Sequence, residues 1–512
     1  MPLKLRVATI VFALGAAAAA GAAGPTLDTK LLERGKTVFG RECAVCHGLS
    51  GKGDGAAAYL LFPPPRDFTS RMFKIRTTPE GEPPTRADLL RTLQRGLPGS
   101  AMPSYGSLPE GDLRALVEYV LSLAGLESTP QQTLAIPQVP PLTKEGITQG
   151  ETVYNDLGCF ECHGPKGDGR GTSATTMKDY KKRPIRPNDF TRGVFKGGSD
   201  PQSILTRFMT GMDGTPMPSF AETANKEQLI ALTQYVLSLS QGRDFQQPGT
   251  GTLPARRVRG NLPLRPSDPR WEKMNPTTVP MMHLHNDGRL PLEVAVRAAH
   301  DGNRLSIFLE WADATRDTEA LSTMMFADGA AVQFPLREKN PPIFAMGNRG
   351  GRVNIWHWNA AAAAGPPEVL ARYPGMAVDD YPLSGRVYPR REMGHPELPS
   401  ARTTRPPFIT AWAAGNPNSA PGRMRGIMDL NAEGFGTLQP QGVKGQNVTG
   451  SGRWRNGKWR VVFTRTLKSP EENDAQLLPG ASQPIAFAVW DGSRRDRNGQ
   501  KSVTTWYRLS IE

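Results

Sequence analysis

Two short segments place a pair of thiols and an imidazole in the same order. They read Cys43-Ala-Val-Cys46-His47 and Cys159-Phe-Glu-Cys162-His163. This Cys-x-x-Cys-His spacing is typical of covalent c-type haem attachment. The two thiols of each segment can bond a porphyrin, and the adjacent histidine can bind its iron. All four cysteines of the chain are used in this way, so none is left for a disulfide.

A methionine follows each segment at nearly the same distance. Met102 comes fifty-nine residues after Cys43, and Met217 comes fifty-eight residues after Cys159. Both stand in Met-Pro-Ser-aromatic, where proline stiffens the loop that would hold the sulfur against the iron. Each methionine is therefore the predicted second iron ligand. Methionine–histidine ligation raises the reduction potential of a haem relative to harder ligand sets. The rival methionines, which lack this repeated context, are Met72, Met177, Met209 and Met212.

The two segments belong to an internal repeat. Residues 66–69 (Arg-Asp-Phe-Thr) correspond to 188–191 (Asn-Asp-Phe-Thr), and 118–123 correspond to 234–239, in the same order and at similar spacing. A short helix is expected over 31–39. The i, i+3, i+4, i+7 spacing of apolar residues predicts a closing helix over 109–123. One mostly helical module is thus used twice.

The repeated half resembles the class I cytochrome c family over residues 28–242. The haem-attachment segments, the Met-Pro-Ser-aromatic loops and the closing amphipathic helix carry this resemblance. It implies two mostly-α cytochrome c domains, over 25–128 and 144–242, each holding one covalent haem c.

The first residues resemble a secretory signal. A positively charged start, a short apolar run and small residues predict a signal peptide over 1–24 and a periplasmic location. An uncleaved membrane anchor is the alternative, and peripheral membrane association stays open. The net charge is +14, but no zinc-finger or helix-turn-helix pattern indicates nucleic-acid binding. This charge is expected to form either a docking surface for an acidic partner or an ordinary solvated surface.

The second half of the chain changes to a two-residue periodicity. Alternating apolar residues bounded by turn residues predict strands over 292–297, 304–311, 459–465, 485–490 and 504–511. We expect a linker over 243–270 and an all-β sandwich over 271–512. A segment rich in Pro, Gly and Arg over 360–422 is expected to be an irregular insert.

Several short motifs of this half occur in one order: Trp311-Ala-Asp313, Phe344-Ala-Met346-Gly347, Val353-Asn-Ile-Trp356-His-Trp358 and Ala488-Val-Trp-Asp-Gly492. Together they resemble the haem-binding domain of the ethylbenzene dehydrogenase and dimethylsulfide dehydrogenase gamma subunit family. The resemblance implies one non-covalent haem b held between Met346 and Lys501. It also implies partner subunits that carry iron–sulfur clusters and molybdenum, in an enzyme of the dimethyl sulfoxide reductase superfamily.

Histidines of the second half are alternative ligands for a haem or another metal. His283 and His285 are spaced to lie on one face of a strand, a spacing that can bind a metal. A histidine at the surface, or one with its hydrogen bonds satisfied, is the commoner situation. The other candidates are His300, His357 and His395.

These observations predict an exported electron-transfer subunit with two covalent c-haems and one b-haem, rather than a catalytic subunit. It would relay electrons between the iron–sulfur subunit of a molybdenum oxidoreductase and a soluble cytochrome or membrane oxidase. Nitrite oxidation and nitrate, chlorate or selenate reduction are the partner chemistries considered. Two alternatives stay open: a self-contained dihaem oxidoreductase such as a peroxidase, and a dihaem cytochrome whose sandwich is a haem-free binding module.

Overall fold

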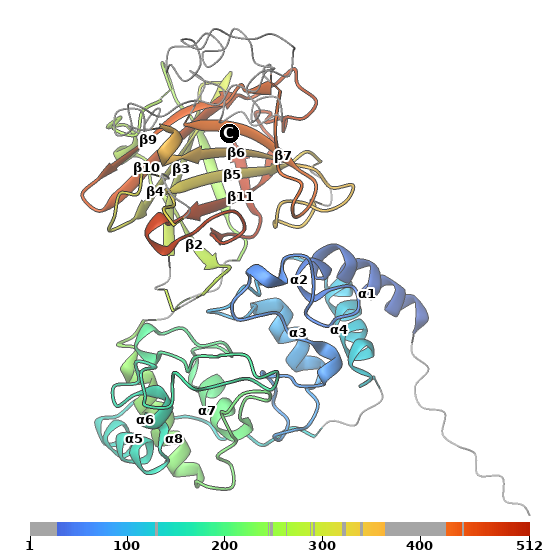
Figure 1. The fold of residues 1–512 in the computed structure, drawn as a ribbon, viewed down its shortest axis with the longest axis vertical. Coiled ribbons are helices and arrows are strands. Elements are labelled where there is room, and N and C mark those ends of the chain that lie inside the picture. Colours follow the sequence, from blue (N-terminus) through green and yellow to red (C-terminus); the bar gives the residue numbers. More distant parts are fainter. Residues whose placement is uncertain are drawn as a thin grey trace, which may run out of the picture.

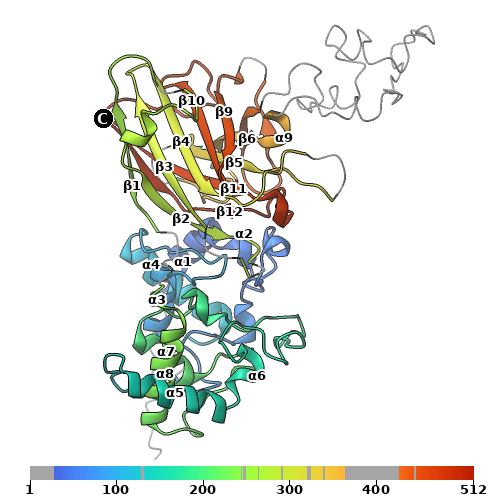
Figure 2. The same ribbon diagram turned by 90° about the vertical axis from the view of Figure 1, so that its left-hand side faces the viewer.

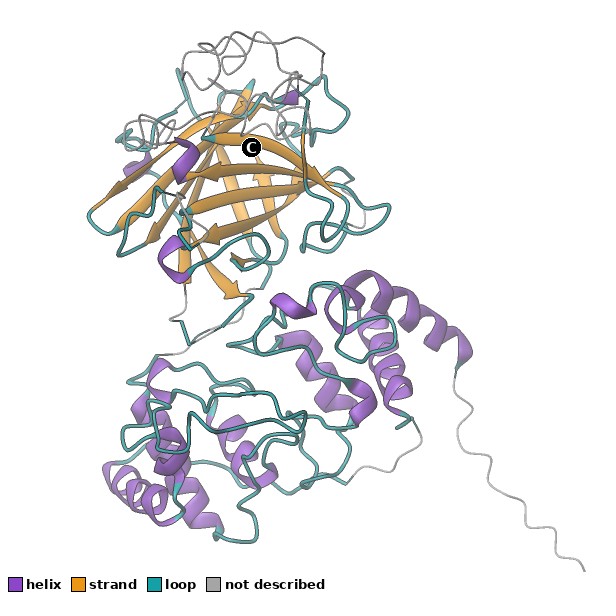
Figure 3. Cartoon of the chain, viewed as in Figure 1, coloured by secondary structure: helices purple, strands orange, loops and turns teal. Residues whose placement is uncertain are grey.

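Two helical units and one β-rich unit follow each other along the chain in the computed structural model (Figure 1). Helices fill the first half and strands the second (Figure 3). No helix in the described part of the chain is long and apolar enough to cross a membrane. The expected leader over 1–24, and the insert beyond residue 363, lie outside the described residues. The structure describes residues 28–127, 132–243, 245, 249–262, 264–286, 288–289, 292–319, 324–337, 341–363, 426–442 and 445–512.

Each helical unit packs its helices around its own apolar core. The first contains α1 (Thr29–Glu42), α2 (Ala44–His47), α3 (Arg86–Arg95) and α4 (Glu110–Ala124), with the short turns η1 (Ala58–Leu60) and η2 (Phe68–Ser70). The second contains α5 (Lys144–Asp156), α6 (Cys159–His163), α7 (Pro201–Thr210) and α8 (Lys226–Leu239), with η3 (Phe190–Arg192). The helices predicted over 31–39 and 109–123 are confirmed. The first is longer than predicted at both ends, and at its start the Asp28 carboxylate caps it by accepting the N–H groups of Lys30 and Leu31.

The first and last helices of each unit cross at a glycine. A Cβ atom on Gly35 of α1 would lie 2.2 Å from the carbonyl oxygen of Ala115 in α4. A Cβ atom on Gly150 of α5 would lie 2.0 Å from that of Ala231 in α8. Because glycine has no Cβ, the two backbones can approach this closely. Gly35 and Gly150 are equivalent in the repeat, so both units are built on the same crossing.

Thirteen strands form the β-rich unit within the described residues. Their order in the sheet is β8-β7-β6-β5-β11-β12-β2-β3-β4-β10-β9, and β13 pairs with β11 and β1. The strands are β1 (Thr252–Arg257), β2 (Thr277–His283), β3 (Leu292–His300), β4 (Arg304–Ala312), β5 (Gly329–Pro335), β6 (Val353–Asn359), β7 (Ile427–Ala432), β8 (Gln439–Pro440), β9 (Thr449–Arg455), β10 (Lys458–Thr466), β11 (Ser482–Trp490), β12 (Ser502–Val503) and β13 (Tyr507–Ile511).

The strands enclose one large apolar core. Leu309 of β4 and Val461 of β10 share this core with Val332 of β5 and Trp356 of β6, although these strand pairs lie far apart in the sheet order. The sheet therefore folds into two facing layers. Most of its pairs are antiparallel, as the alternating apolar pattern of a sheet with one buried face leads us to expect.

The linker predicted over 243–270 is wrong for six of its residues. Strand β1 lies inside this range and pairs in parallel with β13 and β3. Leu253 and Ala255 are buried in the sandwich core. The strand is short and contains Pro254, which weakened its sequence signal. The strand predicted over 504–511 begins only at Tyr507, since Thr504–Trp506 connect it to β12.

The first helical unit lies between the β-rich unit and the second helical unit (Figure 2). Phe62 forms a parallel bridge with His285, its N–H donates to the carbonyl of Leu284, and its own carbonyl accepts from Asn286. The Asn286 side chain also donates to the carbonyl of Gly99, at 2.9 Å. Where the three units meet, the cavity measures only about 20 Å³. The units are therefore in direct, closely packed contact.

The helix crossing yields the first prediction. Gly35→Ala should destabilise the first helical unit by roughly 1–3 kcal/mol, because the added methyl group overlaps a backbone carbonyl that cannot move freely. Urea denaturation followed by far-UV circular dichroism measures this change.

Gly40→Ala is the matched control in the same helix. Nothing lies within 4 Å of a Cβ atom at Gly40, so this substitution should stabilise the helix by roughly 0.5–1 kcal/mol. Equal effects of the two substitutions would contradict the close crossing.

Candidate haem-binding sites

Both predicted proximal histidines are held by the same hydrogen bond. Nδ1 of His47, at the end of α2, lies 2.9 Å from the carbonyl oxygen of Arg66. Nδ1 of His163, at the end of α6, lies 2.9 Å from the carbonyl oxygen of Asn188. A carbonyl can only accept, so Nδ1 carries the proton in each ring and Nε2 keeps its lone pair. This arrangement of the second nitrogen is the one that metal-binding histidines commonly show.

The surroundings of the two rings also match. His47 stacks on Phe68 with ring centroids 4.6 Å apart, and His163 stacks on Phe190 at 4.3 Å. Burial lowers the pKa of His47 to about 4 and also lowers the pKa of His163. Both imidazoles are therefore neutral at physiological pH, the form that binds iron. None of the four cysteines is in a disulfide, so all four are available for covalent attachment of a porphyrin.

The two predicted distal methionines stand in loops with identical hydrogen bonds. The carbonyl of Met102 accepts from the N–H of Leu97, and that of Met217 accepts from the N–H of Met212, each at 3.0 Å. The serine two residues later donates to the preceding helix in both copies: Ser104 to Gln94, and Ser219 to Met209. Both methionine side chains pack against their unit's core. The residues present therefore fit a histidine–methionine haem site in each unit.

Met72 and Met209, two of the rival methionines, have other surroundings. The sulfur of Met72 would be 3.4 Å from a Cβ atom on Gly214, so it faces the second helical unit. Met209 packs into the second unit's core, and its carbonyl accepts the Ser219 hydroxyl that pins the Met217 loop. Met209 thus helps to position that loop from the helix beside it.

A second apolar cluster covers the outer face of one layer of the β-rich unit. It is formed by buried side chains of β2, β5, β6, β7, β11 and β12, and it is separate from the sandwich core. Large apolar side chains that remain partly exposed surround it, as expected of a surface that receives a flat apolar ligand. These are Leu284, Phe344, Met346, Met428, Trp490 and Trp506.

Met346 lies on a segment that crosses this face and is held there by hydrogen bonds from two side chains. The Gln333 side chain donates to the carbonyl of Phe344 at 2.9 Å, and the Trp506 indole donates to that of Pro342 at 2.6 Å. Met346 itself has a φ of +66°, which residues other than glycine seldom adopt. Strained backbone held by its neighbours is frequent at ligand sites.

Lys501 borders the same cluster from the strand side, directly before β12. Its Nζ lies 4.8 Å from the centre of the Trp490 ring. No described carboxylate forms an ion pair with it, and burial lowers its pKa to about 8. Lysine binds iron only as the neutral amine, so this environment suits the predicted role. The nearby Arg494, Arg495 and Arg497 are exposed, in contrast to the half-buried Lys501.

The alternative histidine ligands that the structure describes lie at different points of the β-rich unit and do not form one site. His283 Nδ1 contacts the Ser502 hydroxyl at 2.7 Å, whereas His285 packs on Phe62 of the first helical unit. His357 stands edge-on to Trp490 at 5.1 Å, on the same face as Lys501. His395 lies outside the described residues. Within the part of the chain that the structure covers, the one cluster with metal-ligand spacing contains only Asp313, Asp328 and Asp491.

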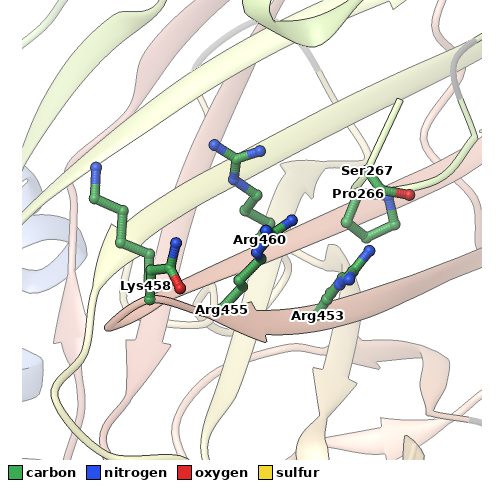
Figure 4. A pocket seen from close by; sticks show the side chains of 7 residues that line it. Pro266, Ser267, Arg453, Arg455, Lys458 and Arg460 are labelled. Carbon is green, nitrogen blue, oxygen red and sulfur yellow. The ribbon is translucent and has the colours of Figure 1, made fainter. Parts of the chain in front are cut away.

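A basic pocket lies on the β9–β10 hairpin (Figure 4). It measures about 360 Å³ and contains four cationic side chains. Arg460 pairs with Glu310 at 2.6 Å and with Glu272 at 2.8 Å, so part of its charge is neutralised. Its lining residues are Pro266, Ser267, Arg453, Arg455, Asn456, Lys458 and Arg460. No candidate haem ligand lines it.

Comparison with protein families assigns both halves of the chain. The family described as cytochrome c matches residues 32–124 and 147–240, and the family described as ethylbenzene dehydrogenase matches 268–502. The chain joins two cytochrome c domains to one domain of the ethylbenzene dehydrogenase family. Cytochrome c domains imply covalent haem c, so this combination gives the chain a haem-based role in electron transfer.

Curated relatives match about half of this chain. The chlorate reductase subunit gamma of Ideonella dechloratans is 27% identical over 49% of this chain and 81% of its own length. The dimethylsulfide dehydrogenase subunit gamma of Rhodovulum sulfidophilum is 25% identical over 49% of this chain and 78% of its own. A solved chain of the reducing HAO-like protein complex Kustc0457/Kustc0458 of Kuenenia stuttgartiensis is 40% identical, covering 40% of this chain and 96% of that chain, with a TM-score of 0.40.

Sequence reasoning did not assign Trp490 and Trp506 to these sites, and it named His357 only as an alternative ligand. Trp490 and Trp506 lie beside Met346 and Lys501, and His357 shares their face although Trp356 and Trp358 point into the core. The strand periodicity carried this information, since alternate residues of β6 face opposite sides. The contacts that the first cytochrome domain makes with the β-rich unit could not be predicted from the sequence.

The methionine loops yield the second prediction. Met102→Leu should lower the midpoint potential of one c-haem and let its iron bind cyanide, because leucine fills the space but donates no lone pair. A spectroelectrochemical titration and a cyanide titration measure these effects.

Met72→Leu is the control, since Met72 is a rival methionine of the same domain. It should leave both properties unchanged. The assignment of Met102 fails if Met72→Leu opens the iron and Met102→Leu does not.

Proposed function

We propose that this protein is an exported electron-transfer subunit with two c-haems and one b-haem. The haems, when bound, supply one-electron carriers. The chain holds them by Cys43, Cys46, His47 and Met102, by Cys159, Cys162, His163 and Met217, and by Met346 and Lys501. The observation that carries the b-haem proposal is that Met346 and Lys501, whose amine pairs with no described carboxylate, border one apolar face together with Trp490 and Trp506.

The packing of the domains supports an order for the relay. Tyr59 of the first cytochrome domain contacts Phe435 edge-on at 6.0 Å, and Leu60 packs against Gly499, two residues before Lys501. The first cytochrome domain therefore covers the rim of the proposed b-haem face. It also contacts the second cytochrome domain (Figure 2). We infer the order b-haem, first c-haem, second c-haem.

The partner is proposed from the relatives. Gamma subunits of chlorate reductase and dimethylsulfide dehydrogenase each match about half of this chain, and the ethylbenzene dehydrogenase family matches its β-rich half. We propose that the b-haem domain receives or delivers electrons at the iron–sulfur subunit of a molybdenum enzyme of this kind. The c-haems would then exchange electrons with a soluble cytochrome or membrane oxidase. The basic pocket at Arg453 and Arg455 is a concave surface suited to an acidic segment of a partner.

A dihaem peroxidase is less well supported. Such an enzyme needs one iron with an open or displaceable distal position. Met102 and Met217 stand in loops with the same hydrogen bonds, so neither domain offers a distinct open site. The haem-free sandwich module is tested by the ligand variants below.

The b-haem face yields the third prediction. Met346→Leu and Lys501→Met remove one donor each while keeping side-chain volume. Each should lower b-haem affinity at least about tenfold or change its absorption spectrum, since even second-shell residues of metal sites contribute that much. Pyridine haemochrome assays of the purified protein measure extractable b-haem and covalent c-haem separately.

Two controls accompany these variants. Met428→Leu changes a methionine of the same apolar cluster, and Lys468→Met removes an exposed lysine of the same domain. Both should retain full b-haem. Full b-haem with an unchanged spectrum in Met346→Leu and Lys501→Met would refute these ligands, and wild-type protein without b-haem would support the haem-free module.

The proposed partner is tested by purification from the native organism. A tagged chain should copurify with subunits that contain molybdenum and iron–sulfur clusters, measured by metal analysis. Recovery of the tagged chain alone under mild, low-salt conditions would contradict the proposed complex.

A further inference from the structure

Two lysines occupy the same position in the two cytochrome domains. Lys74 follows Phe73, and Lys196 follows Phe195, each six residues after the Asp-Phe-Thr segment's phenylalanine. Phe73 and Phe195 also have equivalent ring contacts, with Phe68 at 6.1 Å and with Phe190 at 6.0 Å. The lysines thus occupy equivalent places in each domain, each directly after a phenylalanine that contacts the ring on which the proximal histidine stacks.

The interface between the two domains is built from equivalent pairs. A Cβ atom on Gly99 would lie 2.9 Å from Val194 Cγ1, and one on Gly214 would lie 3.4 Å from the Met72 sulfur. Gly99 and Gly214 are equivalent in the repeat, each three residues before its distal methionine, and so are Val194 and Met72. Each contact therefore joins residues that are equivalent to those of the other contact, with the roles of the two domains reversed. This is the pattern found across the two-fold axis of a symmetric dimer.

The two lysine segments meet at this interface. Gly197 packs near Ile75, with 3.6 Å between a Cβ atom on Gly197 and Cδ1 of Ile75, and these residues are again equivalent. A pair of equivalent residues in contact lies close to the axis that relates the domains. Lys74 and Lys196 each precede a member of this pair, and they are close enough for their charges to repel each other.

Two other cations that cross the interface have carboxylate partners. Buried Arg76 pairs with Asp213 at 2.8 Å, and Lys181 pairs with Asp67 at 2.6 Å.

Lys74 and Lys196 have no ion pair or hydrogen bond from their ammonium groups to the described residues. Asp179, the acidic group whose charge acts on Lys74, is held by Arg183 at 2.7 Å. Arg66 adds a further positive charge beside both lysines, and burial with these neighbours lowers the pKa of Lys74 to about 6. Half-buried cations without an anion are costly, so the site is suited to anionic groups absent from the polypeptide.

We propose that Lys74 and Lys196 form one shared site that binds propionate carboxylates of the two c-haems. Each haem carries two propionates, and these are its negatively charged groups. Ammonium–carboxylate hydrogen bonds are the strong, charge-assisted kind. The inference rests on the covalent haems of the proposed function and is independent of the molybdenum partner.

The test removes one charge at a time from the whole protein. Lys74→Met and Lys196→Met should each lower the midpoint potentials of both c-haems, because a cation beside a haem favours its reduced state and the site is shared. The shift should be larger for the haem of the substituted domain. Spectroelectrochemical titration measures both potentials, and the pyridine haemochrome assay reports whether both haems remain attached.

Lys30→Met and Lys226→Met are matched controls, because these lysines are exposed in the first turns of α1 and α8. They should leave both potentials unchanged, and Lys74→Arg should keep most of the wild-type value. Lys74→Gln and Lys196→Gln replace the methionine variants if those fail to fold.

Different results would overturn the shared propionate site and the haem relay. Full covalent haem with unchanged potentials in the lysine variants would overturn the shared propionate site and leave the relay intact. Absence of covalent haem from the wild-type protein would overturn the relay itself.

Discussion

Each candidate iron ligand in this chain must offer an uncharged lone pair inside an apolar site. Burial meets this requirement for His47 and His163 by lowering the pKa of each imidazole, and it brings the pKa of Lys501 closer to neutrality, to about 8. A hydrogen bond from Nδ1 to a backbone carbonyl then fixes which histidine nitrogen is free. The rest of the fold shields these iron ligands from water and fixes their orientation.

Duplication of one domain explains why the two haem sites have the same local structure. The glycine crossings at Gly35 and Gly150, the serine-pinned methionine loops and the stacked phenylalanines recur in both domains. The copies then pack through equivalent residues, so features placed at that contact become neighbours. Lys74 and Lys196 are close for this reason, although 121 residues separate them in the chain.

Local patterns predicted much of this structure. The helix over 109–123 and the strands over 292–297 and 304–311 follow from apolar periodicity, because each element buries one face. Strand β1 escaped prediction, since its pairing with β13 and β3 is set by residues distant in sequence. The contact of Leu60 with Gly499 and the two-fold packing of the cytochrome domains depend on tertiary structure alone.

Mass spectrometry of the purified protein tests the central claim most directly, because it separates covalent from non-covalent haem in one sample. The account predicts a chain that carries three haems under native conditions and keeps two after denaturation. A denatured chain without haem would contradict the cytochrome sites, and a native chain with only two haems would contradict the b-haem of the β-rich domain.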